Sequence, residues 1–268
     1  MPTTTQHATG MACWPELSTT DQPAAKKFYG ELFGWQPHEN EMGQGETYTM
    51  LKLRNQDVAG LYSMQKEQRA QGILPNWMTY IAVESADQTV AKSKQLGGTV
   101  VMEPMDVFDY GRMAVIKDPT GAVFSVWQPK THAGAGIVNE PGSLVWTELY
   151  TNDPETAKRF YSGLFSYSTE AMSGGSAQNP IPYTVFMKGD SRASGMLKTP
   201  KEMGNVPSHW LTYFAVENCD TTVAKTQQLG GKVLMPPTDI PNIGRFSILQ
   251  DPQGAAFAVI TITMPPQN

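Results

Sequence analysis

An internal duplication constrains this chain more than any other feature of its sequence. The segment 14–35 returns as the segment 146–167, at an offset of 132 residues, and most apolar and aromatic positions are kept. Three further pairs follow at an offset of 133 residues: 77–84 with 210–217, 95–98 with 228–231, and 118–121 with 251–254. Two copies of this size predict a duplicated globular domain and argue against a solenoid. We therefore expect a pseudo-symmetric pair of sites.

The composition excludes several classes of function. The chain has 268 residues with 20 basic and 25 acidic side chains, and no run of Lys or Arg. It therefore lacks the electrostatic footprint of a nucleic-acid or anionic-membrane binder. Cys13 and Cys219 occupy different places in the two copies, so neither a disulfide framework nor a zinc knuckle is expected. The N-terminus shows no export signal, and the apolar runs are shorter than a membrane span of roughly 20 residues, which predicts a cytoplasmic protein.

Each repeat reads as a strand, a helix and three strands, twice over. The first helix is expected to start at Asp21 as its N-cap, with Pro23 in its first turn, and to end at Gly34. Asp153 and Pro154 provide the same start signal in the second copy. The predicted organisation is a disordered tail over 1–9, a first domain over 10–130, a linker over 131–141 and a second domain over 142–264.

This pattern resembles the vicinal oxygen chelate superfamily, which includes glyoxalase I, bleomycin-resistance proteins and extradiol dioxygenases. The motifs that carry the resemblance are Phe28-Tyr29-x-x-Leu32-Phe33-Gly34-Trp35, Leu96-Gly97-Gly98 and the two Asp-Pro-x-Gly turns. The resemblance implies an α+β fold with two tandem glyoxalase-like domains. Each domain would be a pair of βαβββ modules that form curved, cup-like mixed sheets.

The resemblance also implies where a metal would bind. Members of the superfamily usually hold one divalent metal with His and Glu side chains from four strands. The corresponding positions here are Trp14, Lys52, Met78 and Ser125 in the first copy, and Trp146, Met187, Leu211 and Ala258 in the second. A catalytic divalent metal needs about three nitrogen or oxygen ligands, which neither set provides. We predict that the protein uses no metal and no other cofactor.

The four histidines do not suggest a replacement metal site. His7 lies in the tail, His38 after the first helix, His132 in the linker and His209 before a strand. Four unrelated places in the chain indicate ordinary surface histidines.

Two glutamates are the candidates for polar recognition. Glu16 and Glu148 each lie two residues after a tryptophan, Trp14 or Trp146, and strand alternation places each pair on one face. The same alternation brings in Tyr80 and Tyr213 as walls. Aromatic walls around one carboxylate are typical of a pocket for a flat or cationic organic molecule. The alternative is that each glutamate satisfies a helix end or an arginine such as Arg112 or Arg245, and that the aromatic residues are core.

The sequence favours a metal-free protein that binds a small organic molecule, aromatic or cationic, in one or two cups. A metal-dependent glyoxalase-like lyase or isomerase, or a dioxygenase, is the second hypothesis, and would mean that its ligands lie at other positions. A regulatory or interaction protein with filled cups is the third. Whether a reaction is catalysed, and whether the chain is a monomer with an internal pseudo-dimer or a homodimer, stays open at this point.

Overall fold

The structure is a computed structural model, and it describes residues 7–43, 46–176 and 179–263, with the side chains of 173–180 excepted. The first half contains β1 (Ala12–Thr19), α1 (Gln22–Phe33), β2 (Gln36–Gly43), β3 (Glu46–Leu53), β4 (Gln56–Ser63), α2 (Lys66–Ala70), β5 (Asn76–Ala82), α3 (Ala86–Gln95), β6 (Thr99–Val107), β7 (Gly111–Lys117) and β8 (Val123–Pro129). The second half contains β9 (Leu144–Thr151), α4 (Pro154–Phe165), β10 (Ser168–Ser176), β11 (Asn179–Lys188), β12 (Ser191–Lys198), the 3₁₀ turn η1 (Lys201–Met203), β13 (His209–Ala215), α5 (Cys219–Gln228), β14 (Lys232–Ile240), β15 (Gly244–Gln250) and β16 (Ala256–Ile262).

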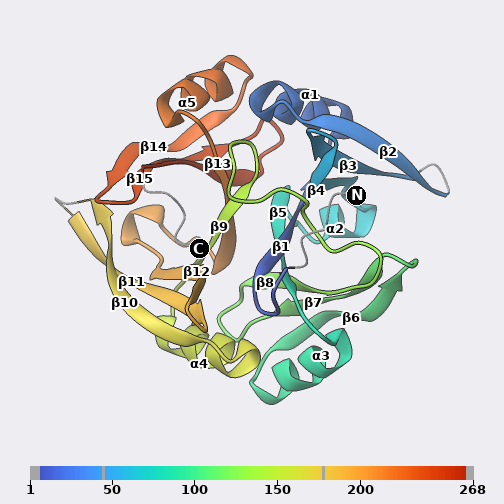
Figure 1. Cartoon of the computed structure of the whole chain (residues 1–268), viewed down its shortest axis with the longest axis vertical. Coiled ribbons are helices and arrows are strands. Elements are labelled where there is room, and N and C mark those ends of the chain that lie inside the picture. The colour runs from blue at the N-terminus through green and yellow to red at the C-terminus, as the bar shows by residue number, and fades with distance from the viewer. Residues whose placement is uncertain (1–6, 44–45, 177–178, 264–268) are drawn as a thin grey trace.

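Each half forms one eight-stranded mixed sheet. The strand order is β2-β3-β4-β1-β5-β8-β7-β6 in the first sheet and β10-β11-β12-β9-β13-β16-β15-β14 in the second. The first strand of each half is parallel to one neighbour, β4 or β12, and antiparallel to the other, β5 or β13. The predicted α+β fold with two tandem pairs of βαβββ modules is therefore confirmed (Figure 1).

The predicted helix signals act as expected. The Asp21 carboxylate accepts a hydrogen bond from the Ala24 amide at 3.0 Å, and Asp153 accepts one from Thr156 at 3.1 Å. Gly34 ends α1 in the left-handed conformation, with φ of 75°, which costs glycine little. These local signals fix where α1 begins and ends and where α4 begins.

The sequence does not locate β2, one of the three strands expected after the first helix, and it does not predict α2. Strand β2 is almost entirely exposed and polar, so it has no apolar alternation to reveal it. Helix α2 is five residues long and buries none of them. Strand β2 forms by pairing with β3, and α2 begins with a local hydrogen bond from the Gln65 amide to Gln68 Oε1 at 2.8 Å.

The linker and the tail have more structure than the sequence suggests. The Ala135 side chain is buried, and its amide donates to the Cys13 carbonyl at 2.8 Å. His7 contacts the Ala135 carbonyl at 2.9 Å, so residues 7–9 and the linker lie together at one end of the first domain. Residues 1–6 of the predicted tail lie outside the described residues.

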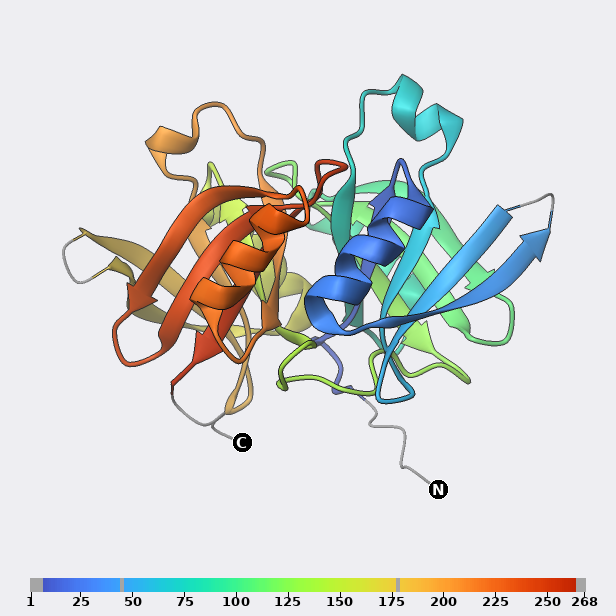
Figure 2. The same ribbon diagram turned by 90° about the horizontal axis from the view of Figure 1, so that it is seen from above.

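The two sheets pack back to back, and the domains share their cores. Helix α1 lies beside α5 (Figures 1 and 2), and α3 lies beside α4 (Figure 1). One core cluster joins apolar side chains of α1 and its strands to side chains of α5, β13 and β16, including Phe28 and Phe257. The other joins α3, β7 and β8 to α4 and its strands, including Phe124 and Phe160. Because each core takes residues from both halves, neither domain has its own complete core on this side.

A pair of equivalent hydrogen-bond chains crosses this interface. Trp77 Nε1 donates to the Tyr29 hydroxyl at 2.9 Å, and that hydroxyl donates to Asp251 Oδ2 of the other domain at 3.0 Å. The reciprocal chain runs from Trp210 to Tyr161 and then to Asp118, with both contacts at 2.9 Å. Each aspartate belongs to an Asp-Pro-x-Gly turn, so the turns found by repetition in the sequence hold the two domains together.

Removal of one tyrosine hydroxyl should destabilise the whole chain. Tyr29→Phe leaves the buried Asp251 oxygen and the Trp77 N–H without this partner, which costs about 1–3 kcal/mol. We expect Tyr161→Phe to cost a similar amount, and Tyr110→Phe, at an exposed position, to cost little. Urea denaturation of the three variants measures the differences. Equal stability of Tyr29→Phe and Tyr110→Phe would show that the interface does not depend on these chains.

Candidate functional site

The face of each sheet opposite the shared core forms the predicted cup. In the first cup, one row of neighbouring residues runs across the sheet from Met50 through Gly60 and Glu16 to Met78. Trp14 and Tyr80 pair directly in an adjacent row. Trp14 and Tyr80 belong to one buried cluster that Met50 and Met78 contact, and the structure therefore places Trp14, Glu16 and Tyr80 together, as strand alternation predicts.

Glu16 is held by two tyrosines. The Tyr48 hydroxyl donates to Glu16 Oε1 and the Tyr80 hydroxyl donates to Oε2, both at 2.7 Å. Trp14 Nε1 donates to the Tyr48 hydroxyl at 3.2 Å. The result is a chain from indole to phenol to carboxylate to phenol.

Glu148 has the same arrangement in the second cup. The Tyr183 and Tyr213 hydroxyls donate to its two carboxylate oxygens at 2.7 Å each. Trp146 Nε1 donates to the Tyr183 hydroxyl at 2.9 Å. All six predicted site residues therefore occur in these two chains, three in each cup. Tyr48 and Tyr183 were not predicted.

A glycine in each cup makes room for the unpredicted tyrosine. A Cβ atom at Gly60 would lie 2.0 Å from the Tyr48 hydroxyl, and one at Gly195 would lie 1.7 Å from the Tyr183 hydroxyl. Any side chain at these positions would therefore push the phenol away from its glutamate. The pair of an aromatic residue and a glycine recurs in both copies, so the repetition itself is the signal that could have revealed Tyr48 and Tyr183.

Burial controls the ionisation of both sites. It raises the pKa of Glu16 above its ordinary value, and the hydrogen bonds from Tyr80 and Tyr48 offset only part of this effect. Burial raises the pKa of Glu148 in the same way. Burial and the nearby Glu16 charge raise the pKa of Tyr48 and Tyr80 well above the ordinary value. The phenols therefore keep their protons and remain hydrogen-bond donors.

A third tyrosine lies near each glutamate, but it comes from a different strand in each cup. Tyr62 of β4 is close enough to Glu16 for the carboxylate charge to raise its pKa, although burial contributes more. Tyr150 of β9 is affected in the same way by burial and by Glu148. Leu197 replaces Tyr62 in the second cup, whereas Ser18 replaces Tyr150 in the first. The two cups therefore use residues of different strands to place a third phenol near the carboxylate.

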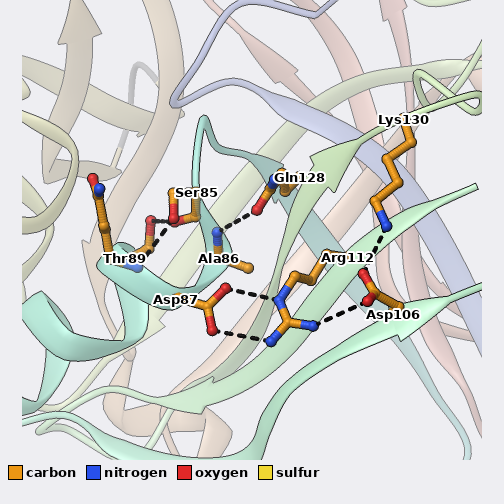
Figure 3. A network of polar contacts seen from close by, with 9 residues as sticks. Ser85, Ala86, Asp87, Thr89, Asp106, Arg112, Gln128 and Lys130 are labelled. Atoms are coloured by element: carbon orange, nitrogen blue, oxygen red, sulfur yellow. Dashed lines mark hydrogen bonds and ion pairs between the residues drawn. The ribbon is translucent and has the colours of Figure 1, made fainter.

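The alternative that an arginine pairs with each glutamate is wrong. Arg112 binds Asp87 with two hydrogen bonds, at 2.7 and 3.0 Å, and also contacts Asp106 (Figure 3). Arg245 binds Asp220 and Asp239 in the same manner. The ion pairs found among the described residues involve neither Glu16 nor Glu148.

The prediction of four surface histidines is correct only for His38, because His7, His132 and His209 are partly buried and burial lowers the pKa of each. His132 of the linker packs edge-on against Trp14, with ring centroids 4.9 Å apart, and burial lowers its pKa. Its carbonyl accepts a hydrogen bond from Trp127 Nε1 at 2.9 Å. The linker therefore closes one end of the first cup, an arrangement that only the tertiary structure reveals.

The residues at the family's metal positions do not fit a divalent metal. Trp14 donates its only N–H to Tyr48, and Lys52 binds Asp57 at 2.5 Å. Ser125 alone offers an oxygen without a hydrogen-bond partner in the first cup, while Leu211 and Ala258 offer none in the second. Among the residues that the structure describes, no group of three or more His, Cys, Asp or Glu side chains could hold a metal. We therefore assign no chemistry to a metal at these positions.

Two surface cavities lie outside the cups. One of about 410 Å³ lies between the start of α5 and the end of β14, beside Arg245, and one of about 340 Å³ lies between α1 and the end of α5.

No helix in the described part of the chain is long and apolar enough to span a membrane.

Sequence comparison identifies the class of this protein. The profile of the Glyoxalase/Bleomycin resistance protein/Dioxygenase superfamily matches residues 6–126 and 143–259, so the chain belongs to this superfamily. It is 43% identical over 261 residues to CFP32 of Mycobacterium bovis, a protein named as a presumed glyoxylase. The match covers 97% of this chain and 98% of that protein. It is also 34% identical over 271 residues to the anthracycline biosynthesis protein DnrV of Streptomyces peucetius, across 96% and 95% of the two chains.

Solved structures show the same fold at low sequence identity. The 2,3-dioxygenase LapB from Pseudomonas sp. KL28 matches with a TM-score of 0.65 and 12% identity, over 96% of this chain and 93% of that one. This similarity supports the architecture alone, because a shared fold does not determine function.

The buried glutamates should make stability depend on pH. A folded-state pKa above the unfolded value means that stability is fully present below about pH 4.5 and is lost as pH rises through the folded pKa. We expect the free energy of unfolding of the wild type to fall, relative to a Glu16→Gln/Glu148→Gln double variant, between pH 4 and pH 8. Urea denaturation across this range measures the slope, and Glu202→Gln, which removes an exposed carboxylate, is the control. Parallel pH profiles of the wild type and the double variant would contradict the raised pKa values.

Proposed function

We propose that this protein binds a small organic molecule, aromatic or cationic, through the glutamate and tyrosines of its cups and without a metal. The observation that carries this proposal is a buried carboxylate, bound by two phenols, that lacks a basic partner among the described residues. A carboxylate offers about four acceptor positions, and the two phenols use two of them. The remaining positions are available to a ligand.

The surroundings of the carboxylate favour an aromatic ligand. Tryptophan and tyrosine side chains surround Glu16 and Glu148, and such walls stack on flat rings and attract cations. The relative in Streptomyces peucetius is named for the biosynthesis of anthracyclines, which are flat aromatic molecules. We therefore propose flat aromatic compounds as the ligand class.

A metal-dependent lyase, isomerase or dioxygenase is the weaker candidate. The residues at the family's metal positions supply too few nitrogen or oxygen ligands, so we derive no reaction through a metal. An interaction protein with filled cups is supported only in part, by the packed side chains of the second cup. We further propose that a monomer suffices for binding, since one chain supplies both modules of each cup.

Loss of both carboxylate charges should abolish tight binding. A thermal-shift screen of flat aromatic compounds, with a fluorescent anthracycline among them, identifies ligands of the wild type. We expect the Glu16→Gln/Glu148→Gln variant to fold but to bind such a ligand more weakly by about 1.5–3 kcal/mol, the contribution of a hydrogen bond to a charged group. Calorimetry measures the affinity, and Tyr110→Phe is the control. Unchanged affinity in the double variant would show that the binding site lies elsewhere.

Metal removal should leave the protein unchanged. We expect elemental analysis of tag-free protein to find no stoichiometric zinc, iron, nickel or manganese, and a chelator to leave the melting temperature and ligand affinity as they were. A melting temperature that falls on chelation and recovers with one metal would contradict the proposal.

A further inference from the structure

The two cups contain the same hydrogen-bond chain but differ in how open they are. Four positions around the glutamate can be compared directly, because the two sheets have equivalent registers. In the second cup the side chains are buried: Val185 is 2% exposed, Leu211 3%, Phe246 7% and Glu148 7%. Their counterparts in the first cup, Met50, Met78, Met113 and Glu16, are all partly exposed. The first glutamate is therefore less covered than the second.

The residues that differ between the two copies explain why the first cup is less buried than the second. Phe246 lies beside Tyr213, with ring centroids 6.2 Å apart, and fills the space in front of that phenol. At the equivalent place the Met113 sulfur lies 3.9 Å from the Tyr80 hydroxyl. Methionine is flexible and polarisable, so a wall of Met50, Met78 and Met113 can adapt to a ligand where a packed phenylalanine cannot.

The segment between β4 and β5 buries less apolar surface than its counterpart between β12 and β13. Helix α2 and the turn η1 lie at the same end of their two domains (Figure 2). Met203 of η1 packs against the apolar cluster of the second cup. In the first domain, α2 buries no residue, and Ile73 and Leu74 just after it are 41% and 73% exposed. Gln68 of α2 donates to the Tyr62 hydroxyl at 3.3 Å, so these exposed apolar side chains follow a helix that contacts the first cup.

The opposite ends of the cups also differ. His132 and Ala135 of the linker cover Trp14, which is 5% exposed, whereas Trp146 remains partly exposed. The edge strands β10 and β14 of the second sheet contact each other and narrow the second cup. The first cup is thus covered at the linker, while the segment just after α2 keeps exposed apolar side chains.

We propose that the first cup alone admits the ligand, which enters past α2. This ligand is an arylalkylamine, a flat aromatic ring with an amine on an alkyl chain, and its ammonium group binds Glu16. This inference rests on the proposed function and assigns it to one cup and one class of compound. An ammonium group supplies the positive charge that the buried carboxylate lacks, and it donates to the acceptor positions that Tyr48 and Tyr80 leave free. The aromatic body would lie against the methionine wall, where sulfur contacts with rings are favourable.

Single variants separate the two cups. Arylalkylamines such as tryptamine serve as probes in calorimetry, and each is compared with a neutral counterpart such as 3-ethylindole. We expect Glu16→Gln to weaken amine binding at least tenfold, and Glu148→Gln to weaken it less than Glu16→Gln does. The control Glu202→Gln, which removes an exposed carboxylate, should leave binding within twofold of the wild type. Wild-type protein should bind one amine per chain and prefer it to its neutral counterpart at least tenfold.

Exchange of residues between the cups tests the proposed entrance. Met78→Leu/Met113→Phe gives the first cup two residues that the second cup already accommodates, and we expect it to block binding without loss of the fold. The reciprocal Leu211→Met/Phe246→Met variant is the matched control and should not abolish binding. The melting temperature reports on folding, and Glu16→Gln decides the matter if the exchange variant unfolds.

The possible failures are distinguishable. Loss of binding in Glu148→Gln but not in Glu16→Gln, or in both equally, would overturn the assignment to the first cup while leaving the proposed function intact. Equal affinity for the amine and its neutral counterpart, or no amine bound with a Kd below about 1 mM, would overturn the ligand class. Unchanged affinity in the Glu16→Gln/Glu148→Gln double variant would instead contradict the proposed function itself.

Discussion

The fold depends on two buried aspartates that each serve both domains at once. Asp251 Oδ1 accepts hydrogen bonds from three amides of its own turn, at 2.8–3.0 Å, while Oδ2 accepts the Tyr29 hydroxyl of the other domain. Asp118 does the same for its own turn and for Tyr161. Because every buried polar group in these chains has a partner, they can sit inside an apolar interface at little cost. The convex faces of the sheets are thereby joined, and the cups face outward.

Indole, phenol and carboxylate groups form hydrogen-bond chains both at the domain interface and in the cups, but the two arrangements differ. At the interface, an indole and a phenol lead to an aspartate whose oxygens are occupied by the backbone and the phenol. In the cups, an indole and two phenols lead to Glu16 or Glu148, and no backbone amide of the described residues donates to either carboxylate. The first arrangement is closed and stabilises the fold, whereas the second keeps acceptor capacity in a low-dielectric setting. Such spare capacity suits ligand recognition, because an unpaired buried charge gains most from a partner.

Duplication has kept the polar chains and changed what surrounds them. Met113 and Phe246 occupy the same position on equivalent strands, yet one contacts a tyrosine hydroxyl through a flexible thioether and the other packs its ring beside a tyrosine ring. The third phenol comes from β4 in one cup and from β9 in the other, as Tyr62 or Tyr150. The hydrogen-bond chain fixes the carboxylate in both cups, while the apolar residues decide whether anything can reach it.

The sequence alone determined the duplication, the helix boundaries at Asp21 and Gly34, and the shared face of Trp14, Glu16 and Tyr80, because repetition, capping and alternation are local rules. It could not locate β2 or predict α2, whose polar residues form no apolar pattern. Nor could it predict Tyr48, whose approach to Glu16 depends on the pairing of β3 and β4 and on the space above Gly60. Only the tertiary structure placed His132 on Trp14 and Tyr29 on Asp251, 222 residues apart. Contacts between distant segments depend on how the two sheets curve and pack, and no local pattern encodes that geometry.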